Sequence, residues 1–194
     1  MTPNYSITRA DIMAPDVYIK EREALRCEVI SLKGKRRVAV GPDIMVYFEN
    51  KKTLLWQIHE MIYIEKGGEE QIVDEIAAYS PLVPKGNELV VTMMIEIDDM
   101  ERRRVTLAQL GHIEHSVQIN FGDMIVKGVA TDDAERTTAA GKTSSVHFLH
   151  FQMTPEQVQS FKNEKEITLG ITHPRYSYTS VLPLAVHQEI MNDL

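Results

Sequence analysis

Residues 33–66 read KGKRRVAVGPDIMVYFENKKTLLWQIHEMIYIEK, and this stretch decides how the rest of the chain is interpreted. Apolar residues alternate with other residues over 37–40 and again over 44–49, which is the period of half-buried strands. The Gly-Pro-Asp sequence at 41–43 favours a tight turn, so the stretch predicts a hairpin. The register that pairs the two residues flanking this turn puts the apolar side chains of both strands on one face.

A helix is predicted directly after the hairpin. Asn50 stands at its N-cap position, where a side-chain oxygen can accept hydrogen bonds from the free N–H groups of the first turn. Apolar residues from Leu54 to Ile62 then recur at helical spacing and form one buried stripe. Thr53, Gln57 and Glu60 form a polar row along the same helix. This row is a candidate lining for a polar pocket, and a solvated helix face is the alternative.

The charges at the start of this helix break a local rule. A helix N-terminus favours acidic residues, yet this one opens with two lysines, and the hairpin brings two arginines to the same end. Cations around a helix N-terminus can bind phosphate, sulfate or carboxylate. The sequence therefore predicts a basic corner that binds a small anion or an acidic protein partner, with a solvated basic turn as the alternative. Its residues are Arg36, Arg37, Asn50, Lys51 and Lys52.

Composition excludes several classes of protein. The chain has 194 residues, of which 43% are hydrophobic and 25% charged, as in an ordinary globular domain. Its net charge of −7 argues against general nucleic-acid binding. With Cys27 as the single cysteine there is no internal disulfide. The absence of a signal peptide and of long apolar runs predicts a cytoplasmic protein that does not enter the membrane.

The order of the predicted elements indicates a single α+β domain over residues 1–194. Residues 1–87 are mainly helical, and the hairpin lies among those helices. Residues 88–194 carry mostly antiparallel strands, among them a long apolar run at 88–97 that is typical of a central strand. We expect the N-terminal helices and hairpin to pack on this sheet, and the pattern leaves open whether the sheet curls into a barrel.

Histidines provide a second candidate site. Two His-x-x-His pairs occur, and His112, His115 and His147 are the candidate metal ligands, with Glu60 as a candidate carboxylate. His147 lies three residues from His150 on a predicted strand, so the two rings point to opposite faces. A buried His147 ring held by a hydrogen bond is the preferred interpretation. Complete zinc-protease, P-loop and nucleophile-elbow motifs are all missing.

The polar stretch at 131–144 is long for a loop in a compact domain. Such a loop is either mobile or a lid over a site, and we favour a mobile loop because it has no apolar anchor.

Four segments resemble the bacterial proteins known as domain of unknown function 3501. These segments are RRVAVGPDIMVYFENKKTLLWQIHEMIYIE at 36–65, YSPLVP at 79–84, GKTSSVHFLHFQMTPEQ at 141–157 and ITHPRY at 171–176. The resemblance implies no established activity and no catalytic residues. Genes of that family often neighbour those of rubrerythrin-like and iron–sulfur proteins, which implies an accessory part in cytosolic redox or metal-linked metabolism and such proteins as partners.

Two functions follow from these observations. The first is an accessory or binding protein that uses the basic corner. The second is a metal-dependent enzyme or metal sensor with histidine and glutamate ligands. No catalytic residue or cofactor is assigned for either, and a homodimer remains open because no coiled-coil pattern decides it.

Overall fold

The predicted hairpin forms in the computed structural model, which describes residues 5–131 and 136–194. Strands β1 (Arg37–Val40) and β2 (Ile44–Glu49) pair antiparallel, with Val40 opposite Ile44 as the sequence predicts. Gly41 has φ +73°, a left-handed conformation that glycine adopts without strain. A Cβ atom there would lie 2.6 Å from the Tyr176 hydroxyl, so the turn also needs glycine for space.

Helix α2 (Lys51–Glu65) begins at the predicted N-cap. The Asn50 side chain accepts a hydrogen bond from the Thr53 backbone N–H at 3.0 Å, and the Thr53 hydroxyl accepts one from the Asn50 N–H. This reciprocal pair satisfies two donors that a helix start otherwise leaves without partners.

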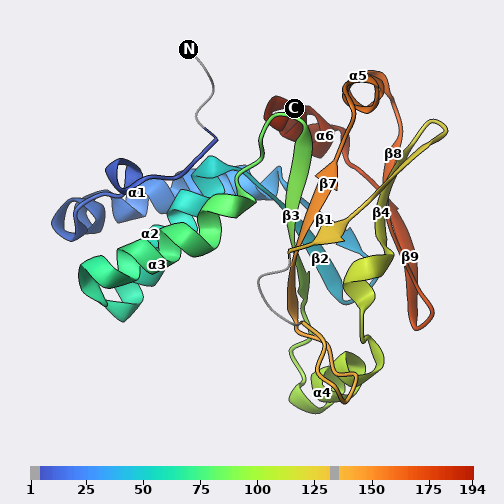
Figure 1. Ribbon diagram of the computed structural model, residues 1–194, viewed down its shortest axis with the longest axis horizontal. Helices are drawn as coiled ribbons and strands as arrows, with labels where there is room; N and C mark the ends of the chain where they lie inside the picture. Colours follow the sequence, from blue (N-terminus) through green and yellow to red (C-terminus); the bar gives the residue numbers. More distant parts are fainter. Residues whose placement is uncertain (1–4, 132–135) are drawn as a thin grey trace.

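The strands form two antiparallel sheets, which confirms the α+β class (Figure 1). The order of the first sheet is β1-β2-β3-β7-β6, so the hairpin extends the sheet by two strands. The order of the second is β5-β4-β8-β9. Over the described residues the sheets stay separate and do not close into a barrel. The remaining strands are β3 (Glu88–Ile95), β4 (Val117–Phe121), β5 (Met124–Lys127), β6 (Val129–Ala130), β7 (Val146–Gln152), β8 (Ile167–His173) and β9 (Tyr176–Val181).

Helices lie beside the first sheet and at the two ends of the sheets (Figure 1). Helix α1 (Pro15–Gly34) packs beside α2, and α3 (Gly68–Tyr79) packs on the other side of α2, so that the three form a layer beside the first sheet (Figure 1). Helix α4 (Met100–Gln109) lies at one end of the sheets, and α5 (Pro155–Asn163) and α6 (Leu184–Ile190) lie at the other. Short 3-10 turns occur at η1 (Arg9–Asp11), η2 (Ser80–Leu82), η3 (Ile113–Ser116) and η4 (Met191–Asp193).

Strand β3 is buried on both faces, as its long apolar run indicates. Leu89, Val91 and Met93 face the main core between the two sheets. Val90 faces the helical layer and joins a second apolar cluster that includes Leu54 and other residues of the helices. The central strand thus carries one core on each side, and the site described below lies on the helical side. None of the helices in the described ranges is long and apolar enough to span a membrane.

His59 of α2 fastens the N-terminal segment to the helical layer. Its Nε2 accepts the Met13 backbone N–H at 2.9 Å, its Nδ1 donates to the Leu55 carbonyl at 2.7 Å, and Tyr18 stacks on the ring. Burial lowers the pKa of His59, and the hydrogen bond to Leu55 opposes that shift only in part. The neutral ring is therefore the form that stabilises the fold.

A His59→Leu variant should reveal this titration. Because the pKa is lower in the folded than in the unfolded chain, the contribution of His59 is complete above pH 6.5 and is lost as pH falls below it. The difference in free energy of unfolding between wild type and variant should therefore shrink from pH 7.5 to pH 5. Urea unfolding at several pH values measures it, and two parallel pH profiles would contradict the assignment.

Candidate functional site

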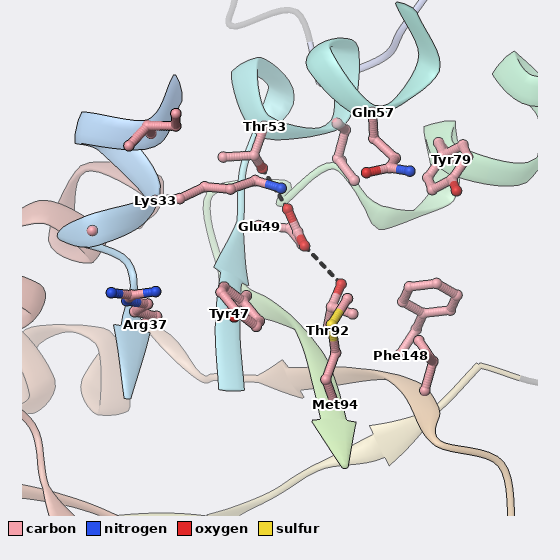
Figure 2. Close-up of a pocket in the computed structure, with 14 residues that line it drawn as sticks. Lys33, Arg37, Tyr47, Glu49, Thr53, Gln57, Tyr79, Thr92, Met94 and Phe148 are labelled. Atoms are coloured by element: carbon pink, nitrogen blue, oxygen red, sulfur yellow. Dashed lines mark hydrogen bonds between the residues drawn. The ribbon is translucent and has the colours of Figure 1, made fainter. Parts of the chain in front are cut away.

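A cavity of about 560 Å³ lies between the helical layer and the first sheet (Figure 2). Pockets of this volume are typical of sites for small organic molecules. Its walls come from the C-terminal part of α1, the first turns of α2, the end of α3 and strands β1, β2, β3 and β7. The lining residues are Ile30, Lys33, Gly34, Arg37, Tyr47, Glu49, Thr53, Leu54, Gln57, Tyr79, Thr92, Met94, Val146 and Phe148.

Strand alternation explains why these side chains meet. Tyr47 and Glu49 point away from the main core, opposite the inward-facing Val46 and Phe48. On β3, Thr92 faces the same side and pairs directly with Tyr47 across the strands. The outer face of the sheet therefore presents a polar strip to the helices, in a region that is otherwise apolar.

Glu49 is the buried acidic residue of the cavity lining. The Thr53 hydroxyl donates to one carboxylate oxygen, and the Thr92 hydroxyl donates to the other at 2.7 Å (Figure 2). These donors from a helix and a strand fix the carboxylate in one orientation. The remaining acceptor positions of Glu49 are available to a hydrogen-bond donor on a ligand.

Two cations also line the cavity. Lys33 is half-buried and extends toward the end where Glu49 and Thr53 lie, whereas Arg37 is exposed beside Tyr47 (Figure 2). Within the part of the chain that the structure describes, neither cation takes part in an ion pair with a carboxylate. Two cations and one carboxylate leave the lining with a net charge of +1 on a protein whose net charge is −7.

The residues of the predicted basic corner are divided among different environments. Arg36 is only 1% exposed, and its guanidinium bonds to Glu189, Asp193 and the carbonyls of Phe48 and Glu49. It therefore cannot face the same ligand as Arg37, because it points into the protein. The hairpin register places the arginines on opposite faces, a consequence that the charge pattern alone does not reveal.

The other residues of the corner line a second cavity of about 350 Å³. Asn50, Lys51 and Lys52 all face it, together with the C-terminal residues 192–194. Lys51 pairs with Asp11 at 2.8 Å and Lys52 pairs with Glu28 at 2.7 Å, so both cations already have carboxylate partners. An anion would have to compete with these partners.

The three residues of the predicted polar row do not all line the same cavity. Thr53 and Gln57 line the first cavity. Glu60 instead accepts hydrogen bonds from Tyr18 at 2.7 Å and from Arg22 at 2.7 and 2.8 Å. The Arg22 guanidinium is the main cause of the lowered pKa of Glu60. The sequence-based prediction did not identify Glu49 and Thr92 as partners of Thr53. A threonine inside the apolar run of β3 does indicate a polar contact on that strand.

The candidate histidines lie in a different part of the fold. His112 precedes the 3-10 turn η3 and His115 lies within it, and their rings stack with centroids 6.0 Å apart. His147 is fully buried and its Nε2 lies 3.0 Å from the Ser144 carbonyl, which confirms the prediction of a buried ring held by a hydrogen bond. Its Nδ1 is 3.6 Å from Glu114, a residue that the sequence did not single out. Glu60 belongs to the helical layer and not to this group.

The loop predicted at 131–144 is only partly described, because residues 132–135 lie outside the described ranges. The rest is fastened to the end of α4. Thr137 and Thr143 form a β-bridge, the Thr143 N–H donates to the Leu107 carbonyl, and the His112 N–H donates to the Thr137 hydroxyl.

Fold and cavity together define a two-sheet α+β protein with a ligand-sized cavity under its helical layer. The chain belongs to the family described as protein of unknown function (DUF3501), whose model matches residues 6–194. A crystal structure of a novel protein of unknown function from Burkholderia pseudomallei K96243 is similar to it, with 35% identity, 100% coverage of both chains and a TM-score of 0.89. No curated protein matches the sequence.

Proposed function

We propose that this protein binds a small amphipathic organic molecule, with an anionic group and a hydrogen-bond donor, in the cavity between α1, α2 and the first sheet. The observation that carries the proposal is the buried Glu49 carboxylate, held by Thr53 and Thr92 at the wall of a 560 Å³ cavity. A buried carboxylate is costly unless it is well hydrogen-bonded, and an apolar pocket with a few convergent polar groups is the usual form of a ligand site.

The lining indicates how such a molecule would lie. Leu54, Met94 and Phe148 offer an apolar surface for its body. Lys33 and Arg37, which form no ion pair with a carboxylate of the described residues, favour a carboxylate or phosphate at one end, and Glu49 accepts a hydroxyl or ammonium donor from another part. Of the residues that the sequence predicts to bind an anion, the proposed site retains Arg37. The other residues of that set are replaced by residues that line the cavity.

The expected role is accessory binding, in a cytoplasmic protein, with no catalytic residue assigned. The metal-dependent alternative, the acidic or iron–sulfur partners and a homodimer stay predictions from the sequence and the family resemblance.

Three probe molecules that share the same apolar phenylbutyl group test which charge the cavity prefers. We expect 4-phenylbutyrate to bind more tightly than 4-phenylbutanol or 4-phenylbutylamine in calorimetric titrations. Lys33→Met and Arg37→Met should each weaken phenylbutyrate binding about fivefold, the scale of a partly exposed ion pair worth about 1 kcal/mol. Lys35→Met is the matched control, because Lys35 is exposed and outside the cavity lining.

A bulky substitution tests whether the probe binds in this cavity. Gln57→Trp should fill the cavity and abolish probe binding, whereas Gln159→Trp on the exposed side of α5 should leave binding unchanged. Equal binding by the two tryptophan variants, or no saturable binding of any probe to the wild type, would overturn the proposal.

A further inference from the structure

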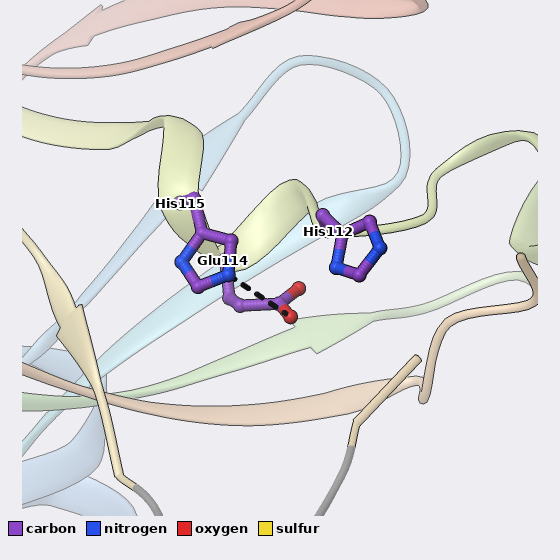
Figure 3. A group of neighbouring side chains, drawn as sticks. All are labelled: His112, Glu114 and His115. Atoms are coloured by element: carbon purple, nitrogen blue, oxygen red, sulfur yellow. Dashed lines mark ion pairs between the residues drawn. The ribbon is translucent and has the colours of Figure 1, made fainter. Parts of the chain in front are cut away.

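A second site is independent of the cavity, and it lies at the 3-10 turn η3 (Ile113–Ser116). Within the described residues, His112, Glu114 and His115 form a group whose candidate ligand atoms all lie within 4.8 Å of one another. Figure 3 shows the Glu114 carboxylate between the two imidazole rings. His115 Nε2 is 3.9 Å from one carboxylate oxygen. Two imidazoles and one carboxylate are a common ligand set for zinc and for non-haem iron.

The backbone at this turn is held in an uncommon conformation. His112 has φ +62° and ψ +24°, a left-handed geometry that few residues other than glycine adopt. The Thr137 hydroxyl fixes this conformation by accepting the His112 N–H at 3.0 Å. The turn brings the His112 ring back beside His115, since the two rings are separated by two residues yet stack nearly parallel, at 14°.

The buried side of the group contains polar atoms without hydrogen-bond partners. Glu114 is 5% exposed and its Oε2 atom has no hydrogen-bond partner among the described residues. His147 Nδ1 faces this oxygen at 3.6 Å, is fully buried and also has no hydrogen-bond partner there.

The other ring nitrogen of His147 has partners of its own. Nε2 lies 3.0 Å from the Ser144 carbonyl and 3.1 Å from the Thr143 hydroxyl. Nδ1 is therefore the atom through which His147 faces the Glu114 carboxylate. A buried carboxylate oxygen without a hydrogen-bond donor is unfavourable unless a cation lies beside it.

We infer that His112, Glu114 and His115 bind a divalent transition-metal ion. The two exposed rings supply nitrogen ligands and Glu114 supplies an oxygen from the protein interior. The ligand atoms all lie within 4.8 Å of one another, and small rotations of the exposed rings would give the separations of about 3–4 Å that metal–ligand bonds near 2.1 Å require. His147 lies behind the Glu114 carboxylate, with Nδ1 3.6 Å from Oε2. Three protein ligands leave coordination positions open for water or a small molecule.

Cobalt(II) is a suitable probe because its visible absorption reports nitrogen and oxygen ligation. We expect untagged, chelator-treated protein to bind one equivalent of Co²⁺, and Zn²⁺ to displace it. His112→Ala, His115→Ala and Glu114→Gln should each weaken Co²⁺ binding by at least about 10-fold. His150→Gln is the matched control, because His150 also contacts a buried glutamate, Glu88, but lies outside the group.

The wild-type protein provides a measurement that does not depend on the folding of any variant. Paramagnetic Co²⁺ should shift or broaden the ring-proton NMR signals of His112 and His115 at one equivalent, while the His150 signals keep their positions. The absence of 1:1 binding, or equal binding by the His112→Ala and His150→Gln variants, would overturn the inference.

Discussion

Replacing Arg36 with methionine is expected to lower the free energy of unfolding by about 3–5 kcal/mol, the cost of removing one partner from a buried ion pair. The Arg36 side chain is 1% exposed, and its guanidinium contacts Asp193, which is 9% exposed, and the more accessible Glu189. Methionine fills much of the same volume but leaves the Asp193 carboxylate without its cation. The carbonyls of Phe48 and Glu49 also lose their donors. Urea unfolding at pH 7 measures the loss.

Two further variants make this prediction specific. Arg37→Met changes the neighbouring, exposed arginine and should alter the free energy of unfolding by no more than about 0.5 kcal/mol. The double variant Arg36→Met/Asp193→Asn removes both charges and should recover part of the loss, as a double-mutant cycle would record. Equal losses for Arg36→Met and Arg37→Met would show that the buried contacts of Arg36 contribute little.

The Arg36 contacts also have a structural consequence. They join the end of the hairpin to the C-terminal turn η4, across 157 positions of the sequence. Because the turn lies at the same end as α5 and α6, Arg36 connects the first sheet to the helices that close the main core. A residue that resembles an anion ligand in the sequence is thus an internal cross-link in the fold.

Replacing Phe161 with alanine is expected to lower the free energy of unfolding by about 3–5 kcal/mol, the usual cost of deleting a buried aromatic ring. Phe161 of α5 is 0% exposed and makes edge-to-face contacts with Phe121 of β4 and His187 of α6. The Phe161 backbone carbonyl also accepts a hydrogen bond from His187 Nε2 at 2.9 Å. Alanine would leave a cavity among three elements that cannot all move to fill it.

Ile125→Ala is the control for this prediction. Ile125 is 57% exposed on the edge strand β5, so its truncation should change the free energy of unfolding by no more than about 0.5 kcal/mol. Thermal or urea unfolding compares the two variants. If Phe161→Ala were no more destabilising than Ile125→Ala, the contact of α5 with the second sheet would be far looser than its packing indicates.

Local rules account for what could be predicted. The register of Val40 with Ile44 follows from the turn and the period of two, and the start of α2 follows from the Asn50 cap. The buried His147 ring follows from its place among apolar residues on one strand face. Each of these depends on residues a few positions apart, so the sequence contains the relevant neighbours.

The candidate sites depend on contacts that the sequence does not display. Thr53 was found because it lies on a polar helix row, but its partner Thr92 comes from β3 and meets it through Glu49. Glu114 was missed because it became a candidate ligand only when the turn η3 placed it between two histidine rings.

By itself, the sequence determined the α+β class, the hairpin, the helix caps and the family to which the chain belongs. Only the tertiary structure decided that Arg36 points inward and Arg37 toward the cavity, because strand alternation sends neighbouring side chains to opposite faces and the C-terminal turn covers one of them. It also decided where cavities remain, since an unfilled volume is a property of how distant elements pack against one another.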